Sequence, residues 1–167
     1  MNPMVNEPKK NGLFVRIRRN FIEHRALWMY LLCDEARKKG LDPETFAPEA
    51  IRRCGLYHGK LSQDQGGSQT LKTLTEQLFP RRTQKIFEMK IRRLTEDQFD
   101  VDFHYCPLVK AWQKQGCAGE EMDRMCEWAM WGDRGIAESY GCELELKKTI
   151  ARGDGICEIR FKRKQTT

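Results

Sequence analysis

The sequence lacks the short motifs that identify the common enzyme classes. It contains no GxGxxG or Walker sequence, no GxSxG and no HExxH, so the usual signatures of nucleotide-binding folds, serine hydrolases and zinc peptidases are missing. Histidine is scarce, with three residues in 167, and the seven cysteines show no paired CxxC spacing. We therefore expect reduced thiols, no metal site and no cofactor.

Long apolar runs are also absent. The longest, Ala26 to Cys33, is far shorter than the roughly 20 residues that a membrane span requires, and the N-terminus shows no signal peptide. These features predict a cytoplasmic protein with no membrane partner. Hydrophobic residues make up 40% of the chain, which is ordinary for a globular protein. We expect a basic lead-in segment over residues 1–19 and one domain over residues 20–167.

The net charge of +6 is spread over the whole chain. The basic residues are interleaved with 24 acidic residues, and only the tail from Arg160 to Lys164 is a dense basic cluster. Such a distribution is typical of a solvated surface and does not indicate nucleic-acid binding. We expect the partner to be a small-molecule substrate, and the composition also allows a homo-oligomer.

Hydrophobic periodicity predicts an α+β fold, with N-terminal helices packed on one antiparallel sheet of about four strands. Two hairpins, separated by a helical segment, would form this sheet. The expected helices run from Asn20 to Gly40, from Asp42 toward Gly55, from Ser68 to Phe79, from Pro107 to Gly116 and from Ala118 onward. The expected strands lie near 85–94, 98–106, 142–150 and 155–163.

The stretch FDVDFHYCPLVKAW contains the first candidate for chemistry. Cys106 stands where an alternating strand hands over to a helix that begins at Pro107, and a helix N-terminus favours a thiolate. His104 lies two residues back on what reads as the same polar face. The alternatives are a small buried thiol at a strand end and a half-exposed histidine beside Asp102.

Asp133 is the second candidate, because it falls on the apolar face of the helix that begins near Ala118. A carboxylate there must be neutralised, paired or used. It could pair with an arginine of a neighbouring helix, cap a helix broken at Gly132 to Gly135, or bind or protonate a ligand. We predict that Cys106 and Asp133 face one cleft.

Five segments, in this order, resemble the L-2-amino-thiazoline-4-carboxylic acid hydrolase family: HRALWMYLLCDEARKKGLD, EAIRRCGLYHG, FHYCPLVKAWQKQG, CEWAMWGDRGIAE and LELKKTIARGDGICEIRFK. The resemblance implies hydrolytic opening of a small amidine-like ring to N-carbamoyl-L-cysteine. Such a reaction needs an acid, a base or thiolate, and a cation for the substrate carboxylate.

The resemblance also suggests roles for individual residues. Asp133 would bind the amidine, and Cys106 would act as nucleophile or position the water. The remaining candidates are His104 or His58 as base, Arg134 or Arg25 as carboxylate clamp, and Trp112 as a further substrate contact.

The main alternative is a non-catalytic small-molecule-binding domain, because the order of elements is also similar to the 4-vinyl-reductase-type domains. The two functions predict different sites. An enzyme needs ionisable groups that converge on a polar cleft, whereas a sensor could use an apolar cavity lined by Trp28, Met125 and Trp128.

Overall fold

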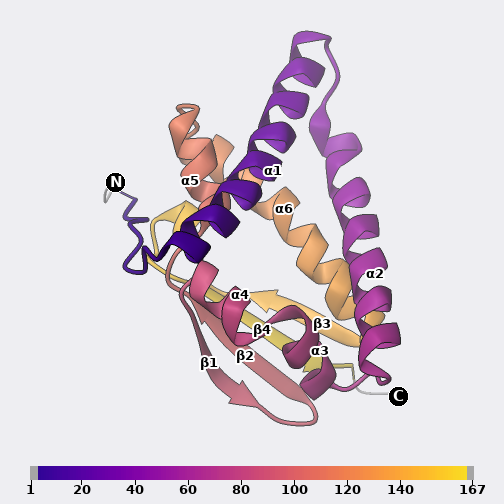
Figure 1. The fold of residues 1–167 in the computed structure, drawn as a ribbon. Helices are drawn as coiled ribbons and strands as arrows, with labels where there is room; N and C mark the ends of the chain where they lie inside the picture. Colours follow the sequence, from indigo (N-terminus) through magenta and orange to yellow (C-terminus); the bar gives the residue numbers. More distant parts are fainter. Residues whose placement is uncertain (1–3, 165–167) are drawn as a thin grey trace.

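The computed structural model describes residues 4–164 and shows helices packed on one antiparallel sheet, as the periodicity predicts (Figure 1). The helices are α1 (Leu13–Lys38), α2 (Ala47–Gly66), α3 (Leu71–Leu78), α4 (Arg81–Ile86), α5 (Pro107–Lys114) and α6 (Gly119–Ser139), with the short 3₁₀ segments η1 (Pro43–Thr45) and η2 (Ile150–Arg152). The strands are β1 (Met89–Leu94), β2 (Gln98–Phe103), β3 (Cys142–Leu146) and β4 (Cys157–Arg163).

The sheet has the order β1-β2-β4-β3, and every neighbouring pair is antiparallel. The two hairpins meet at the centre, where Phe99 of β2 lies opposite Phe161 of β4 and Phe103 lies opposite Cys157. Phe99 and Phe161 are fully buried and stack on each other, and the ring of Phe79 from the end of α3 packs against both at a steeper angle. This inner face and the helices above it form the core.

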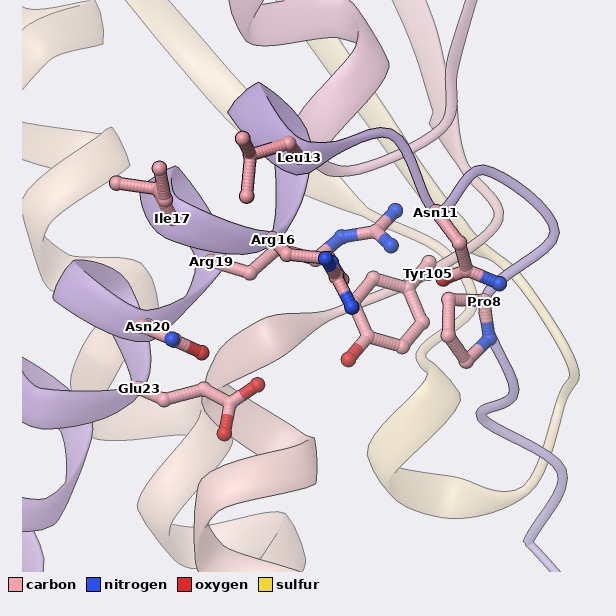
Figure 2. A pocket seen from close by; sticks show the side chains of 9 residues that line it. All are labelled: Pro8, Asn11, Leu13, Arg16, Ile17, Arg19, Asn20, Glu23 and Tyr105. Atoms are coloured by element: carbon pink, nitrogen blue, oxygen red, sulfur yellow. The ribbon is translucent and has the colours of Figure 1, made fainter.

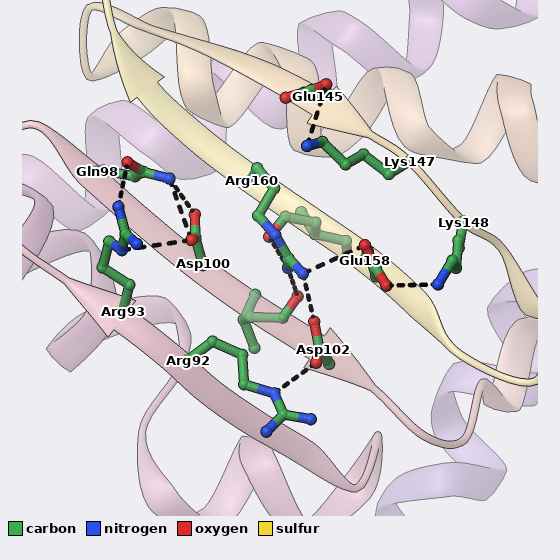
Figure 3. Close-up of polar contacts among 12 residues, drawn as sticks. Arg92, Arg93, Gln98, Asp100, Asp102, Glu145, Lys147, Lys148, Glu158 and Arg160 are labelled. Carbon is green, nitrogen blue, oxygen red and sulfur yellow. Dashed lines mark hydrogen bonds and ion pairs between the residues drawn. The ribbon is translucent and has the colours of Figure 1, made fainter.

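The outer face of the sheet is charged, and the helices lie behind it in Figure 3. Asp102 on β2 is buried, yet Arg92 contacts one of its oxygens at 2.6 Å and Arg160 contacts the other at 2.8 Å. Burial alone would raise the pKa of Asp102, but the two guanidinium groups outweigh it and lower that pKa. The alternation along β2 therefore separates an apolar inner face from an ion-paired outer face.

The first helix begins at Leu13, seven residues before the predicted cap at Asn20. The residue that explains this difference is Arg19, which is only 3% exposed although the sequence reads as a polar lead-in. Its guanidinium contacts Glu88 at 3.1 Å, and Glu88 also accepts hydrogen bonds from the backbone N–H groups of Lys9 and Lys10. This buried network attaches the N-terminal segment to the turn before β1.

The second helix was predicted to run toward Gly55, but α2 continues through the polar stretch that follows and ends at Gly66. Ser62 in that stretch is buried and shares a hydrogen bond of 2.7 Å with the hydroxyl of Tyr140. The short helix α4 was not predicted at all. Six residues, most of them polar or basic, give too little periodicity to reveal it.

Glycines allow α2 and α6 to pack unusually closely. A Cβ atom on Gly55 would lie 1.9 Å from the carbonyl oxygen of Gly132, and one on Gly135 would lie 2.3 Å from the carbonyl oxygen of Arg52. Backbone therefore lies against backbone at this crossing. Helix α6 runs without a break through Gly132 and Gly135, so Asp133 lies inside the helix and does not cap it.

We predict that Gly55→Ala destabilises the protein by roughly 2 kcal/mol or more, because the added methyl group must displace backbone. Gly132→Ala is the matched control, since its Cβ would make an ordinary contact of 3.4 Å with Ile51. Helix propensity alone favours alanine at both positions. Urea unfolding measures both changes, and equal midpoints for the two variants would contradict the close crossing.

Candidate functional site

Cys106 lies between β2 and α5, at the N-cap position of α5, with Pro107 in the first turn of the helix. The side chain packs against the apolar core. Asn6 holds its backbone from the N-terminal segment, donating to the Cys106 carbonyl at 2.8 Å and accepting from the Cys106 N–H at 2.9 Å. Because Asn6 is 2% exposed, this is a buried double hydrogen bond that fixes the position of the thiol.

The surroundings of Cys106 keep its thiol protonated. Burial raises the pKa of Cys106 to about 11, although the nearby N–H groups of Val109 and Leu108 oppose this. The negative charge of Asp133 raises the same pKa further, and the positive charge of Arg25 lowers it. The helix N-terminus is therefore not sufficient to make Cys106 a thiolate at neutral pH.

Asp133 projects from the middle of α6 and is half-buried. Burial raises its pKa from 3.8 to about 6, and the charges of Arg25 and Arg134 reduce this rise. Among residues 4–164, no basic side chain lies within 4.0 Å of its carboxylate as an ion-pair partner. The structure thus holds Asp133 as an unpaired carboxyl group that is mostly ionised at neutral pH.

Two further cysteines belong to the same surroundings. The pKa of Cys157 is raised to about 12 by burial first, and then by the charges of Cys106 and Asp133. Burial also raises the pKa of Cys126 well above its ordinary value, with further contributions from Cys106 and Cys157. The site therefore joins the end of β2, the start of β4 and the middle of α6. The sequence predicted Cys157 as a core residue, which the structure confirms, and its sulfur also accepts a hydrogen bond from the N–H of Ile150 at 3.4 Å.

The two candidate arginines differ in their availability. Arg134 is paired with Glu127 at 2.7 Å and lies over the ring of Trp131 at 5.0 Å. Arg25 on α1 is exposed, and in the described part of the chain it makes neither a hydrogen bond nor an ion pair. Since its charge acts on both Cys106 and Asp133, Arg25 is the cation that is free to meet a ligand there.

His104 lies in a different environment from Cys106. It follows Asp102 with the spacing of two that keeps side chains on one face, and the charges that act on it are those of Lys90, Asp102, Arg92 and Lys9. Burial lowers its pKa, and within residues 4–164 its Nε2 atom has no hydrogen-bond partner. The thiol turns to the inner, core side instead, so the expected polar face shared by His104 and Cys106 is not what the structure shows.

The other two predicted residues, His58 and Trp112, lie on different helices. His58 is exposed on α2 beside the ring of Tyr57. Trp112 is buried, and its indole N–H donates to the carbonyl of Ala26 at 3.0 Å. Trp112 therefore fixes α5 against α1, next to Arg25. The apolar cavity expected for a sensor is not formed by Trp28, which is 63% exposed, while Met125 and Trp128 are core residues.

A surface pocket of about 360 Å³ is bordered by Tyr105 and by residues of the N-terminal segment and α1 (Figure 2). The hydroxyl of Tyr105 and the carboxylate of Glu23 both border it, and Arg19 lies over the Tyr105 ring at 4.1 Å. Burial first, and then the charge of Glu23, raise the pKa of Tyr105 to about 12. Tyr105 and Cys106 are neighbours in the chain, but Tyr105 borders this pocket and Cys106 packs against the core.

All seven cysteines are free thiols. Within residues 4–164, His, Cys, Asp and Glu side chains form no group of three or more that could bind a metal ion. None of the helices in the described region has the length and apolar character needed to cross a membrane.

A family model for L-2-amino-thiazoline-4-carboxylic acid hydrolase matches residues 19–161. A search among curated proteins finds no match. Among solved structures, the chain is similar to a crystal structure of trafficking protein particle complex subunit 3 from Naegleria fowleri, covalently bound to palmitic acid. The TM-score is 0.58 at 17% identity, over 90% of this chain and 97% of the other, so this likeness concerns the fold.

We predict that a native thiol titration with an aromatic disulfide at pH 7.5 shows one fast-reacting cysteine, Cys54, because it is exposed. Cys106 should react slowly, since its pKa of about 11 leaves little thiolate. Cys54→Ser should therefore remove the fast phase and Cys106→Ser should not. A fast phase that survives Cys54→Ser and disappears with Cys106→Ser would show that Cys106 is an activated thiolate.

Proposed function

We propose, since the chain belongs to the L-2-amino-thiazoline-4-carboxylic acid hydrolase family, that it hydrolyses a small cyclic amidine such as 2-aminothiazoline-4-carboxylate. The observation that supports this most directly is the carboxyl group of Asp133, which has a raised pKa and no ion-pair partner, and whose charge acts on the half-buried thiol of Cys106, as does the charge of the free Arg25. Perturbed carboxyl groups of this kind are typical of acid–base sites.

The reaction adds water to the ring carbon that carries two nitrogens and a sulfur. A carbon–oxygen bond forms first, and one proton of the water goes to the ring nitrogen. The carbon–sulfur bond then breaks, the second proton goes to the departing sulfur, and the carbon becomes the carbonyl of N-carbamoyl-L-cysteine. Catalysis requires binding of the amidine, removal of a proton from water and delivery of a proton to sulfur.

Asp133 suits both the binding and the proton transfer. An ionised carboxylate can accept a hydrogen bond from the amino group of the amidine, and a second one from the ring nitrogen once that nitrogen is protonated. With a pKa of about 6, it is also basic enough to take a proton from the attacking water and acidic enough to release it near neutral pH. In this proposal Asp133 performs the role of base that the sequence suggested for His104 or His58.

Cys106 and Arg25 complete the proposed site. The high pKa of Cys106 favours a neutral thiol that positions the water over a thiolate that attacks the ring. Arg25 provides the positive charge for the substrate carboxylate, because Arg134 is already paired with Glu127. A guanidinium can hold a carboxylate with two hydrogen bonds, which orients the ring relative to Asp133.

We predict that Asp133→Asn lowers kcat/KM by about 100-fold or more, because the amide can neither carry the negative charge nor accept the proton. Arg25→Leu should raise KM about tenfold with a smaller effect on kcat, as expected for a residue that binds the substrate carboxylate. Mass-spectrometric detection of N-carbamoyl-L-cysteine measures turnover, and Cys54→Ser, which lies outside the proposed site, is the control.

Full activity of Asp133→Asn would contradict this mechanism. If the wild-type protein forms no product but its melting temperature rises with 2-aminothiazoline-4-carboxylate, the chain is a binding domain and not a hydrolase. Loss of that shift in Arg25→Leu would then still identify the same site.

We predict a pH dependence from Asp133 with a definite sign. Its pKa is 3.8 when unperturbed and about 6 in the folded protein, so ionisation of Asp133 destabilises the folded state. This cost is absent below about pH 4, grows as the pH rises to about 6 and is constant above that. Asp133→Asn should therefore be more stable than wild type at pH 7.5, by on the order of 3 kcal/mol, and gain less at pH 4.5.

Urea unfolding at the two pH values tests this prediction. The same pKa predicts that wild-type kcat/KM falls as the pH drops below about 6, because the base becomes protonated. A wild-type protein more stable than Asp133→Asn at pH 7.5 would mean that the carboxylate is paired and unavailable to a substrate.

A further inference from the structure

We propose that two copies of this chain associate through the outward face of α1, with the two helices antiparallel. Helix α1 has 26 residues, a length of about 39 Å. In Figure 1, α1 and α2 project away from the sheet and are joined at the end farthest from it. One face of α1 packs on the body of the protein through Val15, Arg19, Ala26 and Cys33. The opposite face is the subject of this inference.

Large apolar side chains cover that opposite face. Phe21 is 70% exposed, Trp28 63% and Leu32 65%. The spacing from Phe14 through Ile17, Phe21 and Trp28 to Leu31 alternates steps of three and four once His24 is included, as in a helix that pairs with another helix. The outward face thus consists of these residues: Leu13, Phe14, Ile17, Phe21, Trp28, Leu31 and Leu32.

The size of this face fits a dimer interface. At ~200 Å² for each large apolar side chain, the exposed fractions of these seven residues correspond to roughly 700–800 Å². A standard stable interface buries about 800 Å² on each partner. The largest apolar patch of an ordinary monomer is about 300–600 Å² and is often functional.

The charges along α1 indicate how a second copy would be oriented. Arg16 and Arg18 lie near the start of the helix, whereas its last turns carry both signs, with Asp34 and Glu35 in contact with Lys38 and with Arg37 in the last turn. A parallel pair would place Arg18 beside Arg18, whereas antiparallel pairing keeps the two basic starts apart. A two-fold axis across the middle of the helix gives this arrangement.

The experiment compares oligomeric states by sedimentation velocity and light scattering over about 1–100 µM. Wild type should have twice the chain mass of 19.7 kDa at the higher concentrations. The double variant Phe21→Asp with Trp28→Asp should be monomeric. Leu94→Asp, which changes an apolar residue 42% exposed on β1, is the matched control and should remain dimeric. Circular dichroism checks that each variant keeps its helix content.

A monomeric wild type at 100 µM, or a dimer that survives the double substitution, would overturn the proposal. If a monomeric wild type instead co-sediments with phosphatidylserine vesicles and the double variant does not, the face binds lipid. Since no substrate is used, failure of this test leaves the proposed hydrolase activity unaffected, and loss of turnover leaves the dimer unaffected.

Cross-linking tests the orientation of the pair. In a Cys54→Ser background, the variant His24→Cys places a thiol at the centre of α1, where it should cross-link to its own copy with a short bis-maleimide. Phe14→Cys places the thiol near one end, and in an antiparallel pair the two thiols are too far apart to react. Efficient cross-linking through position 14 would show that the helices are parallel.

Discussion

The close crossing of α2 and α6 determines where the candidate site can form. Because Gly55 lies almost against the carbonyl of Gly132, and Gly135 against that of Arg52, helix α6 cannot rotate about its axis without backbone collision. Successive helical residues are 100° apart. With Gly132 and Gly135 turned to α2, Asp133 between them must point elsewhere, and its charge is one of those that raise the pKa of Cys157 at the start of β4. Gly132 and Gly135 therefore fix the direction in which the Asp133 carboxylate leaves helix α6.

Two buried acids of the chain, Asp102 and Glu88, show how unusual the half-buried Asp133 is. Asp102 lies between two arginines, which keep it ionised. Glu88 accepts from Arg19 and from two backbone N–H groups. Both satisfy the rule that a buried charge is paired or hydrogen-bonded. Asp133 has no ion-pair partner in the described region, and burial raises its pKa to about 6. A carboxylate held in this way costs stability, which favours a role in binding or chemistry over a role in the fold.

The sequence predicted the parts of the structure that depend on local pattern. Alternation in residues 98–103 and 157–163 was enough to find the sheet, because one face is apolar and the other is ion-paired. Asp133 was chosen as a candidate because a carboxylate interrupts an apolar helix face, and the structure places it inside helix α6. The sequence did not predict the features that depend on contacts between residues far apart in the chain. Arg19 reads as solvent-exposed but is buried by Glu88, and Asn6 fixes Cys106 from 100 positions away. His104 and Cys106 share the period of a strand, but the strand ends at Phe103, before the thiol.

Helix α1 connects these observations. Its inner side is fastened at two points, where Arg19 bonds to the carbonyl of Ile86 and where Trp112 bonds to the carbonyl of Ala26. The second attachment also sets the direction of the Arg25 side chain, because Arg25 directly precedes Ala26 in the helix. The outer side makes no contribution to the core and carries the apolar face instead. The binding of a ligand by Arg25 does not require Phe21 and Trp28 to be exposed on the same helix. Exposed aromatic residues promote association, so these two side chains point to a second role for α1. In the two proposals, Arg25 of α1 contacts the ligand, and Phe21 and Trp28 on the outward face of α1 contact the second copy, so one helix carries both sets of residues.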